Sequence, residues 1–359
     1  MRVKPRRKYI RLIALGLLAF GLNYVAPRMP VWVEHIYARL LYPPIGRLLS
    51  SLTSILPFSL AEALVIILPF LLLYGLIKAW RRPRLWLRYL ERLFSYALLA
   101  YIGFTLLWGL NYHRQPLALS LALPLQPSTP EVLASLCADL LDRANELRQQ
   151  VAEDANQVMT LPGGKWRALS RADIGYEQLA RRWPIFGGRY GRPKGVQLSY
   201  WWSYTGTAGM YFPFTGEANV NMTMPDLNIP VVACHEMAHQ RGFAREDEAN
   251  YIAYLACSFH PDVEFQYSGV LLALTNAMRA LQASDPAAYA DLRTKYSPGL
   301  DRDLKANQAF WQAFAGPIER VAGQLNDVYL KSNQQADGIQ SYGRMVDLLL
   351  AEYRAARGR

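Results

Sequence analysis

Cysteine is scarce in this chain. Only Cys137, Cys234 and Cys257 occur among 359 residues. So few thiols, and an odd number of them, exclude a disulfide-stapled framework. Cys234 and Cys257 flank a motif described below, so a single bridge between these two remains open. We expect all three to be small buried side chains.

The sequence also lacks internal repeats, low-complexity blocks and a phosphate-binding loop. Glycines are frequent in residues 184–195, which could suggest a cradle for phosphate. A P-loop, however, needs Gly-Lys followed by Ser or Thr at the start of a helix. Here Lys194 is followed by Gly195 and Val196. The segment is therefore predicted to be a basic loop.

Acidic residues are absent from the first 11 residues, which contain six basic ones. The whole chain has a formal net charge of +11 and a pI of about 9.5. In a soluble protein this excess would suggest nucleic-acid binding. In this chain the basic residues cluster beside long apolar runs, which is the pattern of membrane topology. We therefore expect a lipid bilayer, and no nucleic acid, as partner.

Three apolar runs are candidates for crossing the bilayer, at about residues 10–26, 58–77 and 93–110. The first could be a cleaved signal peptide, but Pro27 directly after it makes a poor cleavage site, so an uncleaved anchor is favoured. Residues 27–57 resemble an amphipathic segment that lies on the bilayer. Glu62, near the start of the second run, is predicted to be solvated at the membrane interface.

The basic residues also predict the orientation. Residues 1–11 and 78–92 each contain six Lys or Arg, so both are expected on the cytoplasmic side. Three spans with a cytoplasmic N-terminus place everything after Tyr112 outside the cytoplasm. The sequence thus predicts a multi-pass protein of the cell (inner) membrane. Its parts are a membrane anchor (1–112), a proline-rich linker (113–127) and an extracytoplasmic domain (128–359).

This extracytoplasmic domain is predicted to be mainly α-helical. Apolar residues at helical spacing predict helices over residues 128–154, 170–182, 262–285, 301–331 and 338–356. β-branched and aromatic residues between Gly and Pro in 196–223 predict two or three short strands. Two interpretations of residues 210–221 remain open. They form an edge strand that pairs with an extended substrate, or an ordinary small sheet that caps the helices.

The stretch from His235 to Asn250 carries the chemistry. It begins with His-Glu-x-x-His, in which the two histidines are four residues apart. On a helix such residues lie on the same face, so His235 and His239 can bind one metal ion. Glu236 is adjacent, where its carboxylate can take a proton from an attacking water. Zinc hydrolases need this set: two neutral imidazoles, a further ligand, an open position and a base.

The third ligand cannot be the one that a metzincin uses. In that class a histidine or aspartate follows three residues after the glycine, where this chain has Arg245. Gly242 can instead end the first helix and let a second helix fold back. An acidic residue of the second helix then comes close to the histidine pair.

Glu246 is the favoured third ligand. Asn250 lies four residues further and faces the same way, where its amide can support a ligand histidine. Glu248 is expected to point to the opposite face and to contact Arg241 or Arg245. It remains the alternative ligand.

His-Glu-x-x-His followed by Glu-x-x-Ala-Asn resembles the gluzincin type of zinc metallopeptidase, with a shorter gap between the two motifs. This resemblance implies Glu246 as third ligand and Asn250 as its support. The whole chain is also similar to an uncharacterised bacterial membrane family, the domain-of-unknown-function family 3810. The matching stretches are residues 211–221, 235–250 and 267–269, together with the three leading spans. The resemblance implies a zinc peptidase without indicating a substrate.

The sequence therefore predicts a membrane-anchored zinc metallopeptidase. His235, His239 and Glu246 would hold Zn²⁺, and Glu236 would act as general base and then as general acid. A Tyr, His or Arg of the C-terminal helices could stabilise the oxyanion. Substrates would be envelope proteins or peptides near the membrane surface, outside the cytoplasm. The alternative is a non-catalytic, zinc-stabilised membrane scaffold.

Overall fold

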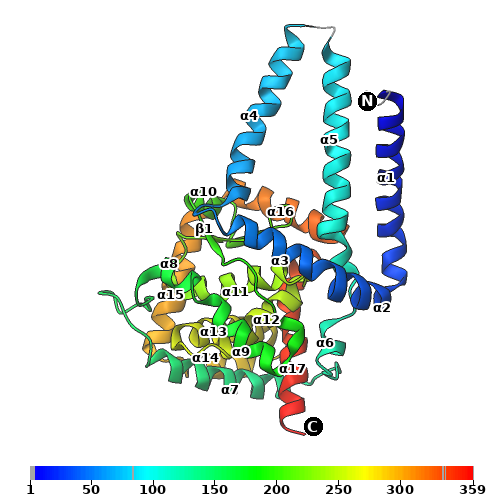
Figure 1. The fold of residues 1–359 in the computed structure, drawn as a ribbon. Helices are drawn as coiled ribbons and strands as arrows, with labels where there is room; N and C mark the ends of the chain where they lie inside the picture. Colours follow the sequence, from blue (N-terminus) through cyan, green and yellow to red (C-terminus); the bar gives the residue numbers. More distant parts are fainter. Residues whose placement is uncertain (1–4, 83–84, 334, 336, 359) are drawn as a thin grey trace.

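The computed structural model describes residues 5–82, 85–333, 335 and 337–358. This part of the chain is mainly α-helical with one small three-stranded sheet, as predicted. Three long helices, α1 (Pro5–Val25), α4 (Leu60–Trp80) and α5 (Trp86–Leu107), rise from a lower part that contains the sheet and the shorter helices (Figure 1).

The three long helices are the candidate membrane spans. They are long and apolar enough to cross a bilayer, with mean hydropathies of 1.6, 2.4 and 1.3. Their apolar side chains are mostly exposed, for example Leu17 and Phe70. Apolar surface of this extent needs lipid or another protein to cover it, which suggests a membrane protein. Helix α5 begins at Trp86, seven residues before the apolar run predicted from residue 93. Its first turns contain the charged residues Arg88, Glu91 and Arg92, which are not part of that run.

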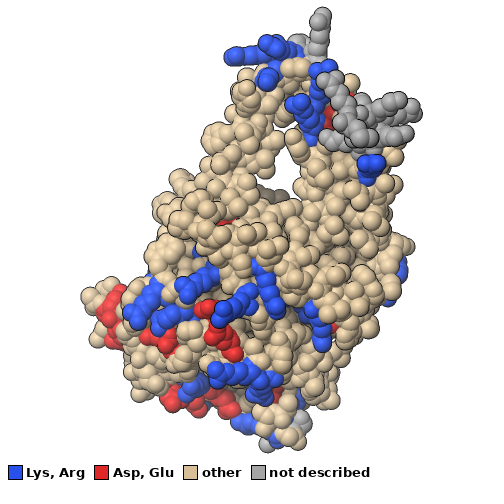
Figure 2. All heavy atoms as spheres, in the orientation of Figure 1, with Lys and Arg blue, Asp and Glu red and all other residues tan. Residues whose placement is uncertain are grey.

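The two ends of this helical bundle differ in charge. Figure 1 shows that α1 begins at the same end as the connection between α4 and α5, and that the lower part lies at the opposite end. Figure 2 shows Lys and Arg at that far end, charged residues of both signs on the lower part, and an uncharged band between them. The predicted basic segments therefore share one end of the bundle. That this end is cytoplasmic remains a prediction.

Residues 26–53 form a helical segment across the base of the spans (Figure 1). Its elements are η1 (Ala26–Arg28), α2 (Pro30–Trp32), the π-helical η2 (Val33–Leu41) and α3 (Tyr42–Thr53). Val33 and Tyr42 are buried on one side, whereas Trp32 and Leu48 are exposed. The segment is amphipathic, as the sequence indicated.

Glu62 was predicted to be solvated, and this prediction is wrong. Its side chain is buried, and its carboxylate accepts the backbone N–H groups of Gln197 and Leu198 at 3.1 and 2.6 Å. Glu62 lies in the first turn of α4, where the helix dipole favours a carboxylate. Glu62 thus connects the first turn of α4 to the segment between β1 and α10.

The predicted linker is partly structured and buried. It overlaps η4 (Gly109–His113) and contains α6 (Leu117–Ser120). Arg114 is buried and forms a bidentate ion pair with Glu34 of η2, in which Nε lies 2.8 Å from Oε2 and Nη2 lies 3.0 Å from Oε1. Its third contact is a hydrogen bond to the Gly242 carbonyl. These contacts connect the span ends to the motif region.

The lower part contains most of the helices. In chain order they are α7 (Pro130–Arg148), α8 (Gly164–Leu169), α9 (Ala172–Arg182), η5 (Pro184–Phe186), α10 (Ser199–Tyr204), η6 (Asp226–Asn228), α11 (Ile229–Gln240), α12 (Glu246–Ser258), α13 (Val263–Ser284), α14 (Pro286–Arg293), α15 (Pro298–Phe314), α16 (Pro317–Ser332), η7 (Gly338–Arg344) and α17 (Met345–Ala356). Helix α13 packs against α7, α11 and α12 and forms the centre of the core.

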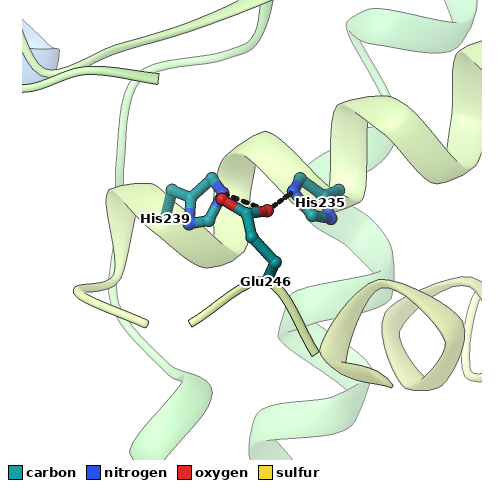
Figure 3. A group of neighbouring side chains, drawn as sticks. All are labelled: His235, His239 and Glu246. Atoms are coloured by element: carbon teal, nitrogen blue, oxygen red, sulfur yellow. Dashed lines mark hydrogen bonds and ion pairs between the residues drawn. The ribbon is translucent and has the colours of Figure 1, made fainter. Parts of the chain in front are cut away.

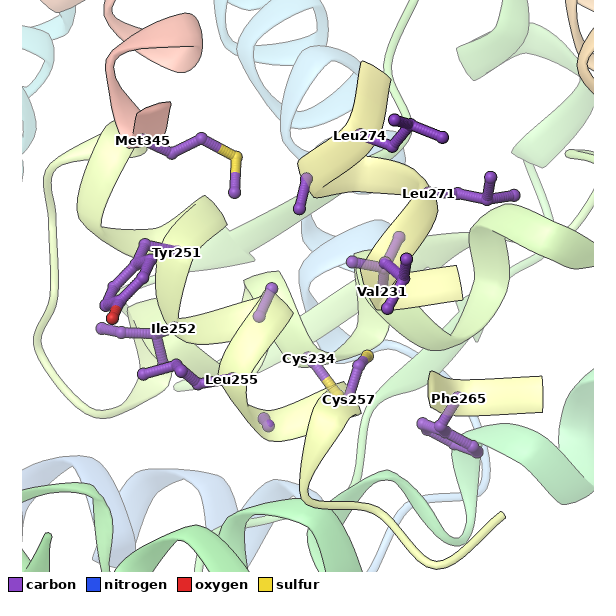
Figure 4. Close-up of a cluster of buried hydrophobic side chains, with 14 of the residues drawn as sticks. Val231, Cys234, Tyr251, Ile252, Leu255, Cys257, Phe265, Leu271, Leu274 and Met345 are labelled. Carbon is purple, nitrogen blue, oxygen red and sulfur yellow. The ribbon is translucent and has the colours of Figure 1, made fainter. Parts of the chain in front are cut away.

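Figure 4 shows side chains of this core, with Val231 of α11, Leu255 of α12 and Leu271 of α13 among those labelled. Cys234 and Cys257 lie beside one another there. All three cysteines are buried and free, so the bridge that the sequence left open is not formed. Tight apolar packing positions α11 and α12, which carry the motif.

Two predicted helices have different limits. Helix α7 ends at Arg148 rather than near residue 154. Further on, Asp154 closes a tight turn by accepting the N–H groups of Asn156 and Val158. The predicted stretch 301–331 is two helices, α15 and α16. Gly316 is extended between them, and Pro317 lacks the N–H that would continue the first helix.

The sheet contains β1 (Lys194–Val196), β2 (Gly209–Phe212) and β3 (Glu217–Asn221), in the order β1-β3-β2. β3 is central, parallel to β1 and antiparallel to β2. Residues 199–204 were predicted within the β segment but form helix α10. Glu62 takes the N–H groups of residues 197 and 198, which ends β1 before the aromatic residues begin.

Candidate metal centre

A tight turn brings the two motif helices together. Helix α11 ends at Gln240, and Gly242 has a φ of +83°, in the left-handed region that glycine adopts without strain. The N–H groups of Gly242 and Phe243 bond back to the carbonyls of His239 and Ala238. Helix α12 then starts at Glu246 and returns alongside α11. The predicted break at Gly242 is confirmed.

The turn places one carboxylate between two imidazoles, as Figure 3 shows. Glu246 Oε2 lies 3.1 Å from His235 Nε2 and 3.5 Å from His239 Nε2. The ligand atoms of the three residues all lie within 4.8 Å of one another. The three side chains could therefore hold one metal ion, as the sequence predicted.

His239 is oriented by its neighbours. Its Nδ1 lies 2.7 Å from the Phe243 carbonyl oxygen, which fixes the proton on Nδ1 and leaves the Nε2 lone pair for a ligand. Trp108, directly after α5, packs its ring edge-on against His239 with centroids 5.5 Å apart. Asn250 is buried on α12. That its amide supports a ligand histidine remains a prediction.

Burial and charge act against each other at the His239–Glu246 pair. Burial by itself lowers the pKa of His239, but the Glu246 carboxylate raises it to about 9. Burial by itself raises the pKa of Glu246, but the two imidazoles hold that pKa well below its usual range. Glu246 is therefore ionised at neutral pH and contributes a negative charge to the site.

Glu236 lies beside this group and differs from Glu246 in its surroundings. Its side chain is buried, and burial raises its pKa. The Tyr211 backbone N–H bonds to the carboxylate, whereas Oε2 has no hydrogen-bond partner among the described residues. A buried carboxylate with a raised pKa and an unpaired oxygen has the properties of a general base.

Strand β2 runs directly past Glu236. A Cβ atom on Gly209 would lie 2.4 Å from Glu236 Oε1, so a larger residue at this position would displace the Glu236 side chain. The predicted substrate edge spanned residues 210–221, and this range needs correction. β3 is central and fully buried, so within this range only the residues of β2, an outer strand, can offer an edge. Substrate pairing at β2 remains a prediction.

An aromatic group borders the site on the side of the spans. Trp108 Nε1 donates to the hydroxyls of Tyr112 and Tyr329, at 3.3 and 3.2 Å, and these hydroxyls are 3.0 Å apart. Burial raises the pKa of both phenols, and the Glu246 carboxylate raises it further. Sequence reasoning missed these residues. Tyr329 is on α16, far from the motif in the chain. The only sequence feature that pointed to Trp108 and Tyr112 was their position at the end of the third apolar run.

Glu248 does not join the metal group. Its Oε1 accepts the Leu117 backbone N–H at 2.7 Å and pairs with Arg245 at 3.1 Å. The predicted contact with Arg245 is confirmed, whereas Arg241 bonds to the carbonyls of Phe186 and Met237 instead. Glu248 therefore fastens α6 to the start of α12.

The donor set fits a catalytic type of metal site. Two imidazole nitrogens and one carboxylate oxygen leave one or more coordination positions for water or substrate. These donors suit zinc, and they also suit other divalent first-row metals. The unpaired oxygen of Glu236 could accept a proton next to these ligands.

Comparison with known proteins identifies a family but no activity. No curated protein and no solved structure matches the chain. A family described as "Protein of unknown function (DUF3810)" matches residues 37–350, a range that includes α3, the second and third spans, the motif helices and α16. The chain therefore belongs to the DUF3810 family, and the match covers the complete candidate metal centre.

Proposed function

We propose that this protein is a zinc metallopeptidase that hydrolyses peptide bonds of envelope proteins or peptides at the membrane surface. One observation carries the proposal. His235, His239 and Glu246 bring their ligand atoms together, and the buried carboxyl of Glu236, which interacts electrostatically with all three, keeps one oxygen without a hydrogen-bond partner among the described residues. Metal ligands without a base would indicate a structural or a metal-storage site. A buried base next to the ligands favours a hydrolytic site.

Zinc, when held by these ligands, would polarise a substrate carbonyl and make an attacking water more acidic. The chain supplies the proton transfers. Glu236 takes a proton from the attacking water through the oxygen that has no other partner. The same carboxyl group then delivers that proton to the leaving amine, so that water is added across the C–N bond.

Tyr329 and Tyr112 are our candidates for stabilising the oxyanion. Their two hydroxyl groups share one hydrogen bond, and Trp108 Nε1 donates to both oxygens. One hydroxyl hydrogen of the pair therefore remains for a substrate oxygen. Removing one such donor typically lowers kcat about 10²–10³-fold. We expect Tyr329→Phe to show a loss of this size with its metal content unchanged.

Strand β2 is our candidate for binding the substrate backbone. It is an outer strand, and Gly209 brings it within contact of Glu236. An extended peptide added along this edge would lie across the base and the ligands. The orientation expected from the basic segments places this edge outside the cytoplasm.

A zinc-stabilised scaffold without activity is the second candidate, and burial favours it. The side chains of His235, His239 and Glu246 are only 13%, 7% and 9% exposed. A structural metal site is closed in this way, whereas a catalytic one keeps an open position.

The variant Glu236→Gln separates the two candidates. The protein would be purified in lipid nanodiscs, its metal measured by elemental analysis, and its activity assayed with a fluorogenic peptide library. An enzyme requires that Glu236→Gln keeps its metal and loses hydrolysis. His235→Ala is the control and should lose both. Metal-loaded wild type with no more hydrolysis than Glu236→Gln would leave the scaffold as the function.

A further inference from the structure

Helix α16 has an apolar stripe that no other part of the described chain covers. Ile318, Val321, Leu325 and Val328 recur at helical spacing and are 58%, 55%, 67% and 64% exposed. Leu330 is the only buried residue of this helix. An exposed stripe along a whole helix marks an interaction surface.

Both ends of α16 are connected to the bases of the spans. Just before its start, Phe314, the last residue of α15, packs on Tyr200 and Tyr204 of α10, with ring centroids 5.5 and 5.0 Å apart. Helix α10 directly follows the backbone N–H groups that bind Glu62 at the base of α4.

At its other end, α16 contacts the last turns of α5. Tyr329 packs on Phe104 with ring centroids 6.5 Å apart and bonds to Trp108. Phe104 lies about 4.5 Å before the end of α5 along the helix axis. Figure 1 accordingly shows α16 across the base of the spans, level with α3 and α10.

We infer that α16 is an interfacial helix that lies in the bilayer surface with its apolar stripe in lipid. Three observations favour lipid over a protein partner. The helix lies at the level where the candidate spans leave the membrane. Helix α10, whose following loop approaches Glu319 of α16 at Gly206, also exposes Trp201 (64%), a residue type typical of membrane interfaces. Exposed Arg320 and Lys331 flank the stripe, as in helices that bind phospholipid headgroups.

This placement fixes how the metal centre faces the membrane. α16 passes the loop before β2, where Glu319 Cγ would lie 3.5 Å from a Cβ atom on Gly206, and it reaches the site through Tyr329. The start of α16 therefore lies beside the loop that leads into β2. If the proposed hydrolytic function holds, a membrane-attached peptide can reach the β2 edge without leaving the bilayer surface.

Depth-dependent quenching tests the lipid contact. Single cysteines would replace Val321, Leu325 or Arg320 and carry an environment-sensitive fluorophore; the three native thiols are buried and do not compete. The control, Arg320→Cys, precedes Val321 and lies about 100° around the helix. The full chain would be reconstituted in nanodiscs of phosphatidylcholine and phosphatidylglycerol, with nitroxide groups near the top of the acyl chains.

We expect severalfold stronger lipid quenching at Val321→Cys and Leu325→Cys than at Arg320→Cys, together with weaker quenching by aqueous iodide. Equal lipid quenching at all three positions would overturn the inference. So would efficient cross-linking between copies through Val321→Cys, because a second copy would then cover the stripe. The readout needs neither metal nor hydrolysis, so its failure is distinct from failure of the proposed function.

Discussion

Replacing Glu246 by glutamine is the sharpest test of the metal centre. The change keeps the size of the side chain and removes the charge that lies between the two imidazoles. Glutamine is a weaker ligand, and it leaves His235 and His239 as the remaining strong donors. We expect the metal affinity to fall while the fold is kept, because the helices are held by the core around α13.

The size of the loss follows from the number of ligands. Structural zinc sites with four ligands bind with about 10–16 kcal/mol, which is about 2.5–4 kcal/mol for each ligand. At about 1.4 kcal/mol for a tenfold change, losing one ligand raises the Kd about 10²–10³-fold. Titration against a chromophoric zinc chelator measures this change, and elemental analysis of purified protein gives the metal content.

Glu248→Gln is the matched control, two residues along the same helix. Its carboxylate binds the Leu117 N–H and Arg245 and not the metal group. Glutamine can still accept the N–H, so only charge assistance is lost, about 1–1.5 kcal/mol of unfolding free energy. The Kd for zinc should be unchanged. Loss of zinc from Glu248→Gln with normal binding by Glu246→Gln would refute the assignment of the third ligand.

Two further changes test the surroundings of the site. Gly209→Ala puts a methyl group 2.4 Å from Glu236 Oε1 and should lower peptide hydrolysis about 100-fold with metal content unchanged, whereas Gly323→Ala, with nothing within 4 Å, should leave hydrolysis unchanged. Glu34→Gln leaves Arg114 charged and buried, and should lower the free energy of unfolding by about 3–5 kcal/mol in a denaturation assay at neutral pH. Burial by itself raises the pKa of Glu34, but Arg114 keeps it below its usual value. The wild-type stability from this pair is therefore complete above about pH 4.5 and declines as the pH falls through the folded-state pKa, and a Glu34→Gln protein with unchanged stability across this range would contradict the assignment.

Local features of the fold were predictable from the sequence. Long apolar runs identify the candidate spans because span length depends only on bilayer thickness. His235 and His239 share a face because the helical repeat requires it. The break at Gly242 follows from the backbone freedom of glycine, and it places Glu246 near the histidines. Each of these conclusions depends on residues within one or two helical turns.

Features that depend on contacts between distant segments were not predictable. Glu62 was expected in solvent, but its partners are N–H groups of residues 197 and 198, which no local pattern indicates. Tyr329 reaches the site only because α16 crosses the base of the spans. Gly209 leaves room for Glu236, whose side chain comes from another element. Sequence periodicity gives the type of an element but not its neighbours.

Helix α11, which carries His235 and His239, contacts the membrane part of the chain as well as the helical domain. The Tyr42 hydroxyl of α3 lies 3.0 Å from that of Tyr211 and 3.4 Å from the His239 carbonyl oxygen. Trp108, at the end of a candidate span, packs on the His239 ring. The family match also begins at residue 37, before α3 and the second span. The candidate ligand His239 is therefore held at a fixed position relative to the spans, because Trp108 after α5 and Tyr42 of α3 both contact it. Under the proposed function, a site fixed in this way would act on peptides at the membrane surface, which is the substrate class proposed above.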